Sequence, residues 1–450
     1  MKHFESSGLW SPKDDMSNAV GGTLRYDSEG LNLKLLGSFG EAWSAGVERY
    51  SIIRGVVDEN PYGTFVTLID CFRKQSRFNM AGVTSETIRC GRAAIGTTHL
   101  PDGMFHFEKL ELHFSYLNDW VGQTGIKFEV INDTGYSINY TKPEILSFSF
   151  GDQKLTLAPS ARWTRGIHHA ELDEETLIVI EPIGEHSPAE LGGDRVQILQ
   201  NLLTFATDTP NEIADITYLG TKYDQGLHAE YHLVFDPIFR LKKDKEPLHS
   251  SDMLFTFKDA QSQDLNIFQN WLDFTERNPS FCTVFFANLY AEPRYLNDRF
   301  ATLMLAFTLL ATTIGEVSER TKLFLSDVEA ALKSRFSDEA REFLDHIIPT
   351  SAEIEMPYLF LRLLQENADT MKLFIDDMPG FVRSVFDTLD FFQRRSEGKR
   401  PHIQGVSLLH AMLKTRMLLK IVVLKELGFG EDVVRSLVLR NNRINFLRTV

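Results

Sequence analysis

The spacing of apolar residues changes once along this chain, from alternation to a helical period, and this change limits the possible folds most strongly. Residues 22–40 hold two short alternating runs joined by DSEG, a turn sequence typical of a β-hairpin. The segment HFEKLELHFSYL (106–117) also alternates apolar and polar residues. Short strands at this spacing predict an antiparallel sandwich or a partly closed barrel.

From about residue 265 the apolar period becomes helical. FCTVFFANLY (281–290) is an exception, and its aromatic and β-branched residues predict one more strand or an extended connector. The most apolar run, 300–314, is short for a bilayer span and contains four threonines, so it predicts a buried core helix. The last long apolar segment ends at Gly428, the position expected for a glycine that ends a helix.

These patterns predict an α+β multidomain protein. We expect an N-terminal antiparallel β-sandwich-like domain in residues 1–241 and a C-terminal α-helical bundle in residues 291–450. Residues 242–290 are then a linker that contains a short helix and an extended segment.

Composition excludes several classes of protein. The N-terminus lacks the apolar core of a secretion signal, and no segment is long enough to span a membrane, so we expect a cytoplasmic protein without a membrane partner. Cys71, Cys90 and Cys282 are too widely spaced for a zinc or disulfide framework. The neighbouring His168 and His169 would point to opposite faces of a strand, which argues against a shared metal. We therefore expect no metal site and no cofactor.

Two parts of the chain resemble one known family. GLWSPKDDMSNAVGGTLRYDSEGLNLKLLGSFG and the later GTFVTLIDC resemble the N-terminal domain of ApeA-type bacterial antiphage proteins. LNDRFATLMLAF and LLKIVVLKELGF resemble the ApeA-like HEPN helical domain. The resemblance implies a HEPN-type bundle that dimerises and acts as a metal-independent ribonuclease in abortive infection. It also implies an arginine, a polar residue and a histidine four to six residues after the arginine.

This motif is not matched where the resemblance places it, in FDTLDFFQRR. Leu389 stands at the arginine position, Asp390 at the polar position and Arg394 at the histidine position. Leucine cannot hold a phosphate, and an arginine side chain does not exchange its proton near neutral pH. The helical period places Leu389 on an apolar stripe and spaces Asp390 and Arg394 as a surface ion pair. We therefore expect the usual catalytic site to be lost.

Displaced residues remain as alternatives for a ribonuclease site. Arg394, Arg395 and His402 are candidate catalytic residues, although Gly398 and Pro401 interrupt the helix that would hold them together. Arg341 and His346 have a suitable spacing but lie upstream of the expected position. LRNNRINFLR (439–448) contains Arg-Asn without a following histidine.

Charge is distributed unevenly along the chain. Residues 394–448, the basic tail, carry twelve lysines and arginines and four acids, a net charge of +8 in a chain whose total is −15, which leaves −23 elsewhere. Such asymmetry indicates an RNA-facing surface, and the alternative is that the tail balances acidic helices of the same bundle. The candidate RNA-binding residues are Arg394, Arg395, Lys399, Arg400, Arg440 and Arg443.

The sequence thus predicts an ApeA-like antiviral defence protein whose helical bundle binds RNA or has a regulatory role and does not cleave RNA. An active ribonuclease and a structural partner of another nuclease are the alternatives. Expected partners are a second copy of the chain, joined through the bundle, an RNA ligand such as tRNA, and a phage-derived trigger.

Overall fold

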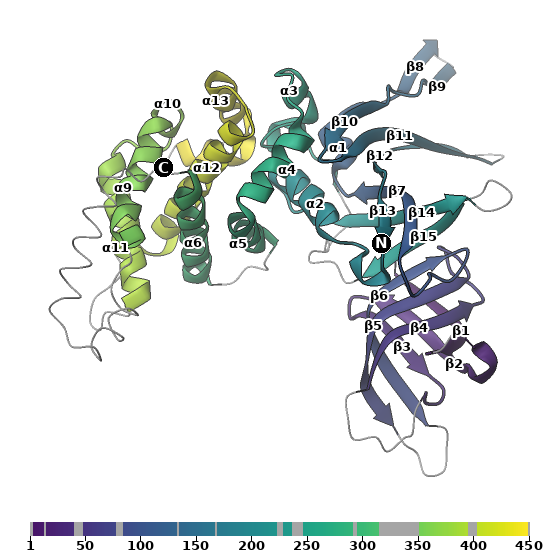
Figure 1. Ribbon diagram of the computed structural model, residues 1–450. Helices are drawn as coiled ribbons and strands as arrows, with labels where there is room; N and C mark the ends of the chain where they lie inside the picture. The colour runs from purple at the N-terminus through teal and green to yellow at the C-terminus, as the bar shows by residue number, and fades with distance from the viewer. Residues whose placement is uncertain are drawn as a thin grey trace, which may run out of the picture. The chain divides into compact units, whose positions relative to one another are not determined.

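The computed structural model describes residues 3–12, 15–39, 48–77, 84–132, 135–166, 169–222, 228–235, 246–290, 295–314, 351–394 and 403–448. The chain forms two compact units, Met1–Gln261 and Ser262–Val450. The N-terminal unit is rich in strands and the C-terminal unit is helical, so the fold class predicted from the change of period is confirmed (Figure 1).

Six antiparallel strands of the N-terminal unit close into a barrel, in the order β1-β2-β3-β6-β5-β4. Their bounds are β1 (Phe4–Ser11), β2 (Val20–Asp27), β3 (Gly30–Leu35), β4 (Arg49–Val57), β5 (Phe65–Arg77) and β6 (Ser85–Gly96). The predicted hairpin is confirmed, because β2 and β3 pair up to Asp27 and Gly30 at the DSEG turn.

Strand β6 belongs both to the barrel and to a larger sheet. Its residues 86–89 pair with β3 inside the barrel, whereas residues 92–96 pair with β15. From β15 a larger sheet continues in the order β14-β7-β12-β11-β10, and β13 pairs with β7. The bounds are β7 (Phe105–Phe114), β10 (Leu146–Phe150), β11 (Gln153–Arg165), β12 (Ala170–Glu181), β13 (Gly184–His186), β14 (Ile213–Lys222) and β15 (His228–Phe235). The expected sandwich or partly closed barrel is therefore a closed barrel extended by a sheet.

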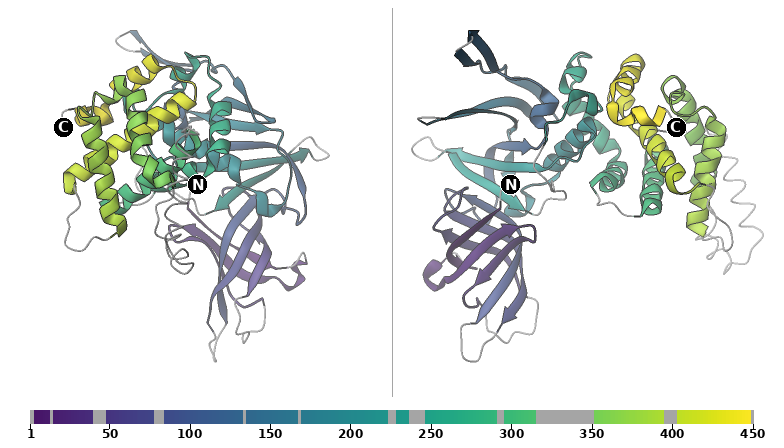
Figure 2. Two further views of the ribbon diagram at one scale, coloured as in Figure 1. Left: turned by 60° about the vertical axis from the view of Figure 1, so that its left-hand side comes forward. Right: turned by 180° about the vertical axis from the view of Figure 1, so that it is seen from behind.

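Strands β8 (Ile126–Asn132) and β9 (Gly135–Tyr140) pair only with each other in the described part of the chain. Figures 1 and 2 show this ribbon extending from the end of the unit that carries β10. Phe128, Val130 and Ile138 lie on one face of the ribbon, and more than half of each side chain is exposed.

A tryptophan fills the interior of the barrel. Trp10 is fully buried, and its indole Nε1 donates a hydrogen bond to the carbonyl oxygen of Gly22 at 3.1 Å. A Cβ atom at Gly55 would lie 2.2 Å from the Trp10 ring, so this position of β4 has no room for a larger residue. The barrel core is completed by aliphatic side chains from the other five strands, β2 to β6.

Helices in the N-terminal unit pack beside the larger sheet. They are α1 (Leu117–Val121), α2 (Asp194–Thr207) and α3 (Phe257–Gln261), with short 3₁₀ turns η1 (Met16–Asn18), η2 (Pro188–Glu190) and η3 (Ser250–Asp252). The indole of Trp120 in α1 donates to the carbonyl of Phe255 at 3.1 Å, and the backbone N–H of Phe255 donates to Ala206 in α2. The prediction missed α2, although Val196, Leu199 and Leu203 have helical spacing.

The C-terminal unit consists of helices in its described residues. They are α4 (Ile267–Arg277), α5 (Pro279–Tyr290), α6 (Leu296–Ile314), α9 (Ser351–Glu366), α10 (Ala368–Met371), α11 (Met378–Arg394), α12 (Gly405–Glu426), α13 (Glu431–Arg440) and the 3₁₀ segment η4 (Asn442–Arg448). Phe360 of α9 is fully buried and contacts Phe307 of α6 and Phe386 of α11, with ring centroids 4.7 and 5.7 Å away. Residues 315–350 of the predicted helical bundle lie outside the described residues.

The expected extended segment at 281–290 is wrong, because these residues form the helix α5. Pro279 begins the helix, where its missing N–H is not needed. Phe281 packs on Phe274 and Phe286 packs on Trp271, so burial against α4 outweighs the strand preference of the aromatic residues.

Two other predictions for the helical region are confirmed. The apolar run 300–314 lies in α6 and buries one face, including Phe300, Met304 and Phe307. Gly428 follows α12 with a φ of +96°, and Phe429 N donates to Leu424 O, the bond expected at a glycine-terminated helix. Within the described residues, no helix has the length and apolar character needed to cross a membrane.

Candidate functional site

The predicted motif positions lie on the last turns of α11. Leu389 is half-buried, on the side of the helix where Val385 is fully buried. Asp390 is exposed. Arg394 is the last residue of α11, but its side chain lies outside the described residues, so the expected ion pair with Asp390 stays a prediction. An apolar and an acidic side chain at these positions do not form a phosphate site.

Several candidate residues cannot be placed. Arg395, Lys399, Arg400 and His402 lie outside the described residues, and so do Arg341 and His346. Their proposed roles in RNA binding or catalysis therefore stay predictions.

Arg440 and Arg443 flank a sharp turn between α13 and η4. Asn441 is fully buried between them, and its side-chain oxygen accepts the backbone N–H of Arg443 at 2.9 Å. Arg440 is half-buried at the end of α13, and Arg443 is exposed. The buried asparagine thus fixes the backbone that carries both arginines.

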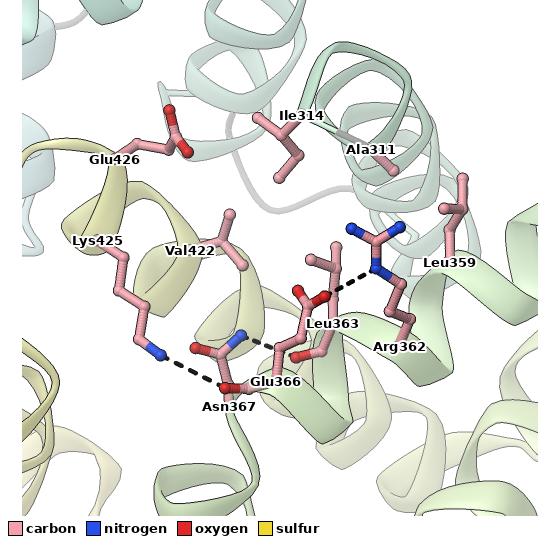
Figure 3. A pocket seen from close by; sticks show the side chains of 10 residues that line it. All are labelled: Ala311, Ile314, Leu359, Arg362, Leu363, Glu366, Asn367, Val422, Lys425 and Glu426. Carbon is pink, nitrogen blue, oxygen red and sulfur yellow. Dashed lines mark hydrogen bonds and ion pairs between the residues drawn. The ribbon is translucent and has the colours of Figure 1, made fainter. Parts of the chain in front are cut away.

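A cavity of about 190 Å³ lies between α6, α9 and α12 of the C-terminal unit (Figure 3). Ala311, Ile314, Leu363 and Val422 supply apolar walls. Asn367 lies at the end of α9 and is 3% exposed; its Nδ2 donates to the carbonyl of Leu363 at 2.8 Å. Its Oδ1 has no hydrogen-bond partner within the described part of the protein, so this oxygen can accept a hydrogen bond from a bound molecule or water.

The charges around this cavity are paired. Arg362 Nε lies 2.7 Å from Glu366, and Lys425 Nζ lies 3.1 Å from Glu431 (Figure 3 shows the first of these pairs). Glu426 lies 3.3 Å from Arg277. Because each charge has an opposite partner, the cavity has no excess positive charge to attract a phosphate.

The N-terminal unit has a polar cluster on the paired strands β14 and β15. The Nδ1 atom of His232 lies 3.3 Å from Asp215 and 3.0 Å from the Thr217 hydroxyl, and its Nε2 lies 3.0 Å from Glu230. Burial lowers the pKa of His232, but the hydrogen bonds and charges of Asp215 and Glu230 outweigh it and raise the pKa to about 9. The imidazole is thus protonated at neutral pH and cannot serve as a general base.

Of the two neighbouring histidines singled out in the sequence, only His169 lies in the described part of the chain. His169 is exposed and lies 3.4 Å from Glu171, and His168 is outside the described residues. Among described residues, no three histidine, cysteine or acidic side chains are grouped to hold a metal ion. Cys71 and Cys90 are buried opposite each other on β5 and β6, where the hydrogen bond between the two thiols, followed by burial, raises the pKa of Cys71.

Sequence reasoning missed one pairing of cations. Arg299 on α6 lies outside the basic tail, yet the structure brings it near Arg416 on α12. The only sequence signal is that each arginine falls on the apolar stripe of its helix, since Leu303 and Met412 are four residues away and buried.

Comparison with known proteins identifies the N-terminal half. The family model described as "ApeA N-terminal domain 1" matches residues 5–271, which is more than half of the chain and covers the barrel, the larger sheet and the start of α4. No curated protein and no solved structure matches the chain. The chain therefore belongs to the ApeA N-terminal domain 1 family.

Proposed function

We propose that this chain is an antiphage defence protein of the ApeA-like class, whose helical C-terminal region is a HEPN-type bundle that binds RNA or regulates, without cutting RNA itself. The family match over residues 5–271 supports the defence role, because ApeA-type proteins are antiphage proteins. The family model ends within α4, so the HEPN character of the later helices rests on the sequence resemblance alone.

The loss of nuclease activity rests on one observation, the residues at the expected motif positions of α11. Leu389 is half-buried in the apolar layer, and Asp390 is an exposed acid. A nuclease of this type needs a guanidinium to neutralise the scissile phosphate and an imidazole to move the proton. Neither Leu389 nor Asp390 can take the guanidinium role.

The charge of the basic tail supports RNA as the ligand. Residues 394–448 have a net charge of +8, and Arg440 and Arg443 lie on a turn at the end of α13. Cationic side chains that contact phosphates release counterions, so binding through this tail must weaken as salt increases. We further propose a homodimer joined through the bundle, tRNA as one RNA ligand, and a phage-derived trigger that acts on the β domain.

RNA incubation tests this function. We expect the purified protein to bind RNA with a strong dependence on salt and to leave total RNA intact in EDTA. The variants Arg394→Ala and His402→Ala are compared with the wild type by gel electrophoresis for cleavage and by fluorescence anisotropy for binding.

Each outcome separates the candidate functions. Cleavage that persists in EDTA and is lost in His402→Ala would show an active ribonuclease with displaced residues. Absence of RNA binding at any salt concentration would leave a structural partner of another nuclease.

A further inference from the structure

The cavity between α6, α9 and α12 contains a buried hydrogen-bond acceptor that lacks a donor. Asn367 lines this cavity and is 3% exposed, and its Nδ2 donates to the carbonyl oxygen of Leu363 at 2.8 Å. Because a carbonyl can only accept, this bond fixes the amide with its nitrogen toward Leu363. The other amide atom, Oδ1, is buried and has no partner among the described residues. A molecule that enters the cavity must therefore bring a donor to satisfy this oxygen.

The walls and the size of the cavity suit a small molecule with apolar surfaces. Ala311 and Ile314 come from α6, Leu363 from α9 and Val422 from α12 (Figure 3). The volume of about 190 Å³ is below the roughly 300–1,000 Å³ of pockets that hold drug-sized ligands. It is several times the ~30 Å³ that one water molecule occupies in the liquid. The cavity thus has room for a single ring system, and the rest of a larger ligand would lie outside it.

The charged residues that line the cavity exclude a charged ligand. Two of them are cationic, Arg362 and Lys425, and two are anionic, Glu366 and Glu426. Arg362 Nε lies 2.7 Å from the Glu366 carboxylate, and Lys425 Nζ lies 3.5 Å from the Glu366 carbonyl oxygen (Figure 3). An ion bound here would lose water without gaining an unpaired counter-charge, so an uncharged ligand is favoured. The Glu366 contact also holds the guanidinium of Arg362 in place, and flat rings stack on such planes.

We propose that this cavity binds one uncharged nucleobase, and that an N–H group of the base donates to Asn367 Oδ1. A nucleobase combines the three properties that the cavity requires. It is uncharged at neutral pH, its flat faces pack on aliphatic side chains or on a guanidinium, and its edge carries N–H donors. The ribose and any phosphate then lie outside the cavity. Because the charges of the lining are already paired, a nucleoside and its monophosphate should bind with equal affinity.

The base can belong to a free nucleoside or to RNA. Where it belongs to RNA, the site deepens the proposed function and rests on it, because an unstacked base then enters the bundle in addition to the phosphate contacts. A free nucleoside would instead be a small-molecule ligand of the same bundle. The chemistry at Asn367 is the same in both cases, so the experiment must separate these sources.

Nucleosides and methylated analogues test the site in the full-length protein. Adenosine, guanosine, cytidine and uridine are each titrated by isothermal calorimetry, and we expect binding of at least one of them. An analogue of the bound nucleoside whose base nitrogens carry methyl groups in place of hydrogen should bind at least about tenfold more weakly, because Oδ1 of Asn367 then stays unpaired.

Asn278 provides a matched control for Asn367. It is also 3% exposed, its Nδ2 donates to the carbonyl oxygen of Phe274 at 2.9 Å, and its Oδ1 likewise lacks a partner in the described chain. Asn278 does not line the cavity. Asn367→Ala and Asn278→Ala each remove one hydrogen bond at a helix end, so their melting temperatures should fall by similar amounts. Only Asn367→Ala should weaken nucleoside binding, by at least about tenfold.

A second variant tests the cavity without changing the asparagine. In Val422→Phe the larger side chain fills part of the cavity, so nucleoside binding should be lost while the hydrogen bond of Asn367 to Leu363 stays intact. Full nucleoside affinity in Val422→Phe, or equal loss of affinity in the two asparagine variants, would show that the base does not bind in this cavity.

RNA binding, measured by fluorescence anisotropy, distinguishes the site from the proposed function. A bound nucleoside that competes with RNA would support entry of an RNA base into the cavity. Nucleoside binding that Asn367→Ala loses, without binding of any RNA, would support a site for a free nucleoside and refute the RNA function. If no nucleoside binds at millimolar concentration and both asparagine variants bind RNA equally, the site is refuted and RNA binding stands.

Discussion

At the scale of single residues, the pKa of a side chain changes when the fold brings charged residues from other strands or helices close to it. The sequence drew attention to His168 and His169, yet among the described histidines it is His232 whose pKa is raised to about 9. Its partner Glu230 lies two residues away on the same strand, β15, whereas Asp215 comes from β14 and approaches His232 only because the two strands pair. Arg299 and Arg416 are a second case, since 116 intervening residues separate them. The pKa of a side chain thus depends on which distant strands or helices the fold places beside it.

His232 should make stability depend on pH. Its pKa is about 9 in the folded chain and about 6.5 in the unfolded chain, so its ion pairs stabilise the fold fully below pH 6.5 and lose this effect as the pH rises through 9. On the acid side, the lowered pKa values of Asp215 and Glu230 mean that their contribution is lost as they are protonated. Burial and, after it, the negative charge of Glu230 raise the pKa of the adjacent Glu111. Protonation of Glu111 therefore stabilises the fold as the pH falls, which opposes the loss from Asp215 and Glu230.

Urea unfolding of the wild type and His232→Gln at pH 6.5, 8 and 9.5 tests this effect. We expect the wild type to be the more stable at pH 6.5, and the difference to shrink steadily toward pH 9.5. A difference in unfolding free energy that stays constant over this range would show that His232 does not bind its extra proton in the folded state.

At the scale of elements, the strand β6 joins the barrel to the larger sheet. Its first residues pair with β3, and its last residues pair with β15, while β5 follows the other edge. Gly96 is the last residue of β6 and pairs with Tyr231 of β15, and a Cβ atom there would lie 1.9 Å from the carbonyl oxygen of Glu230. The close approach of β6 and β15 therefore requires glycine.

Gly96→Ala should destabilise the N-terminal unit. The added methyl group forces β6 and β15 apart, and a misfit of this kind costs about 1–3 kcal/mol. Circular dichroism melting measures the effect, with Gly103→Ala as the matched control, because a Cβ atom at Gly103 meets no atom within 4 Å. Equal melting temperatures for both variants would contradict the close pairing of these strands.

At the scale of the whole molecule, the chain has two compact units with separate cores. Trp10 is fully buried in the barrel of the first unit, and Phe360 is fully buried among the helices of the second. The family match covers residues 5–261 of the first unit and the first ten residues of the second, so the family identity rests mainly on the β-rich unit. The charge asymmetry concerns the other unit, because the whole basic tail lies in residues 262–450.

Separate cores predict separate responses to substitution. Trp10→Ala and Phe360→Ala should each cost about 3–5 kcal/mol in the unit that contains the residue. Hydrogen exchange measured by mass spectrometry should then show faster exchange in residues 1–261 for Trp10→Ala and in residues 262–450 for Phe360→Ala. Faster exchange throughout both units in each variant would show that the chain unfolds as one cooperative unit.

The sequence by itself determined the features that depend on local spacing: the change from strands to helices, the hairpin at DSEG, the buried helix α6 and the glycine after α12. These follow from side-chain periodicity and turn chemistry, which act between near neighbours. Only the tertiary structure decided that β6 closes a barrel with β3 and β5, that 281–290 is helical, and that Arg299 lies near Arg416. Those outcomes depend on which distant surfaces bury each other, and no local pattern encodes that choice.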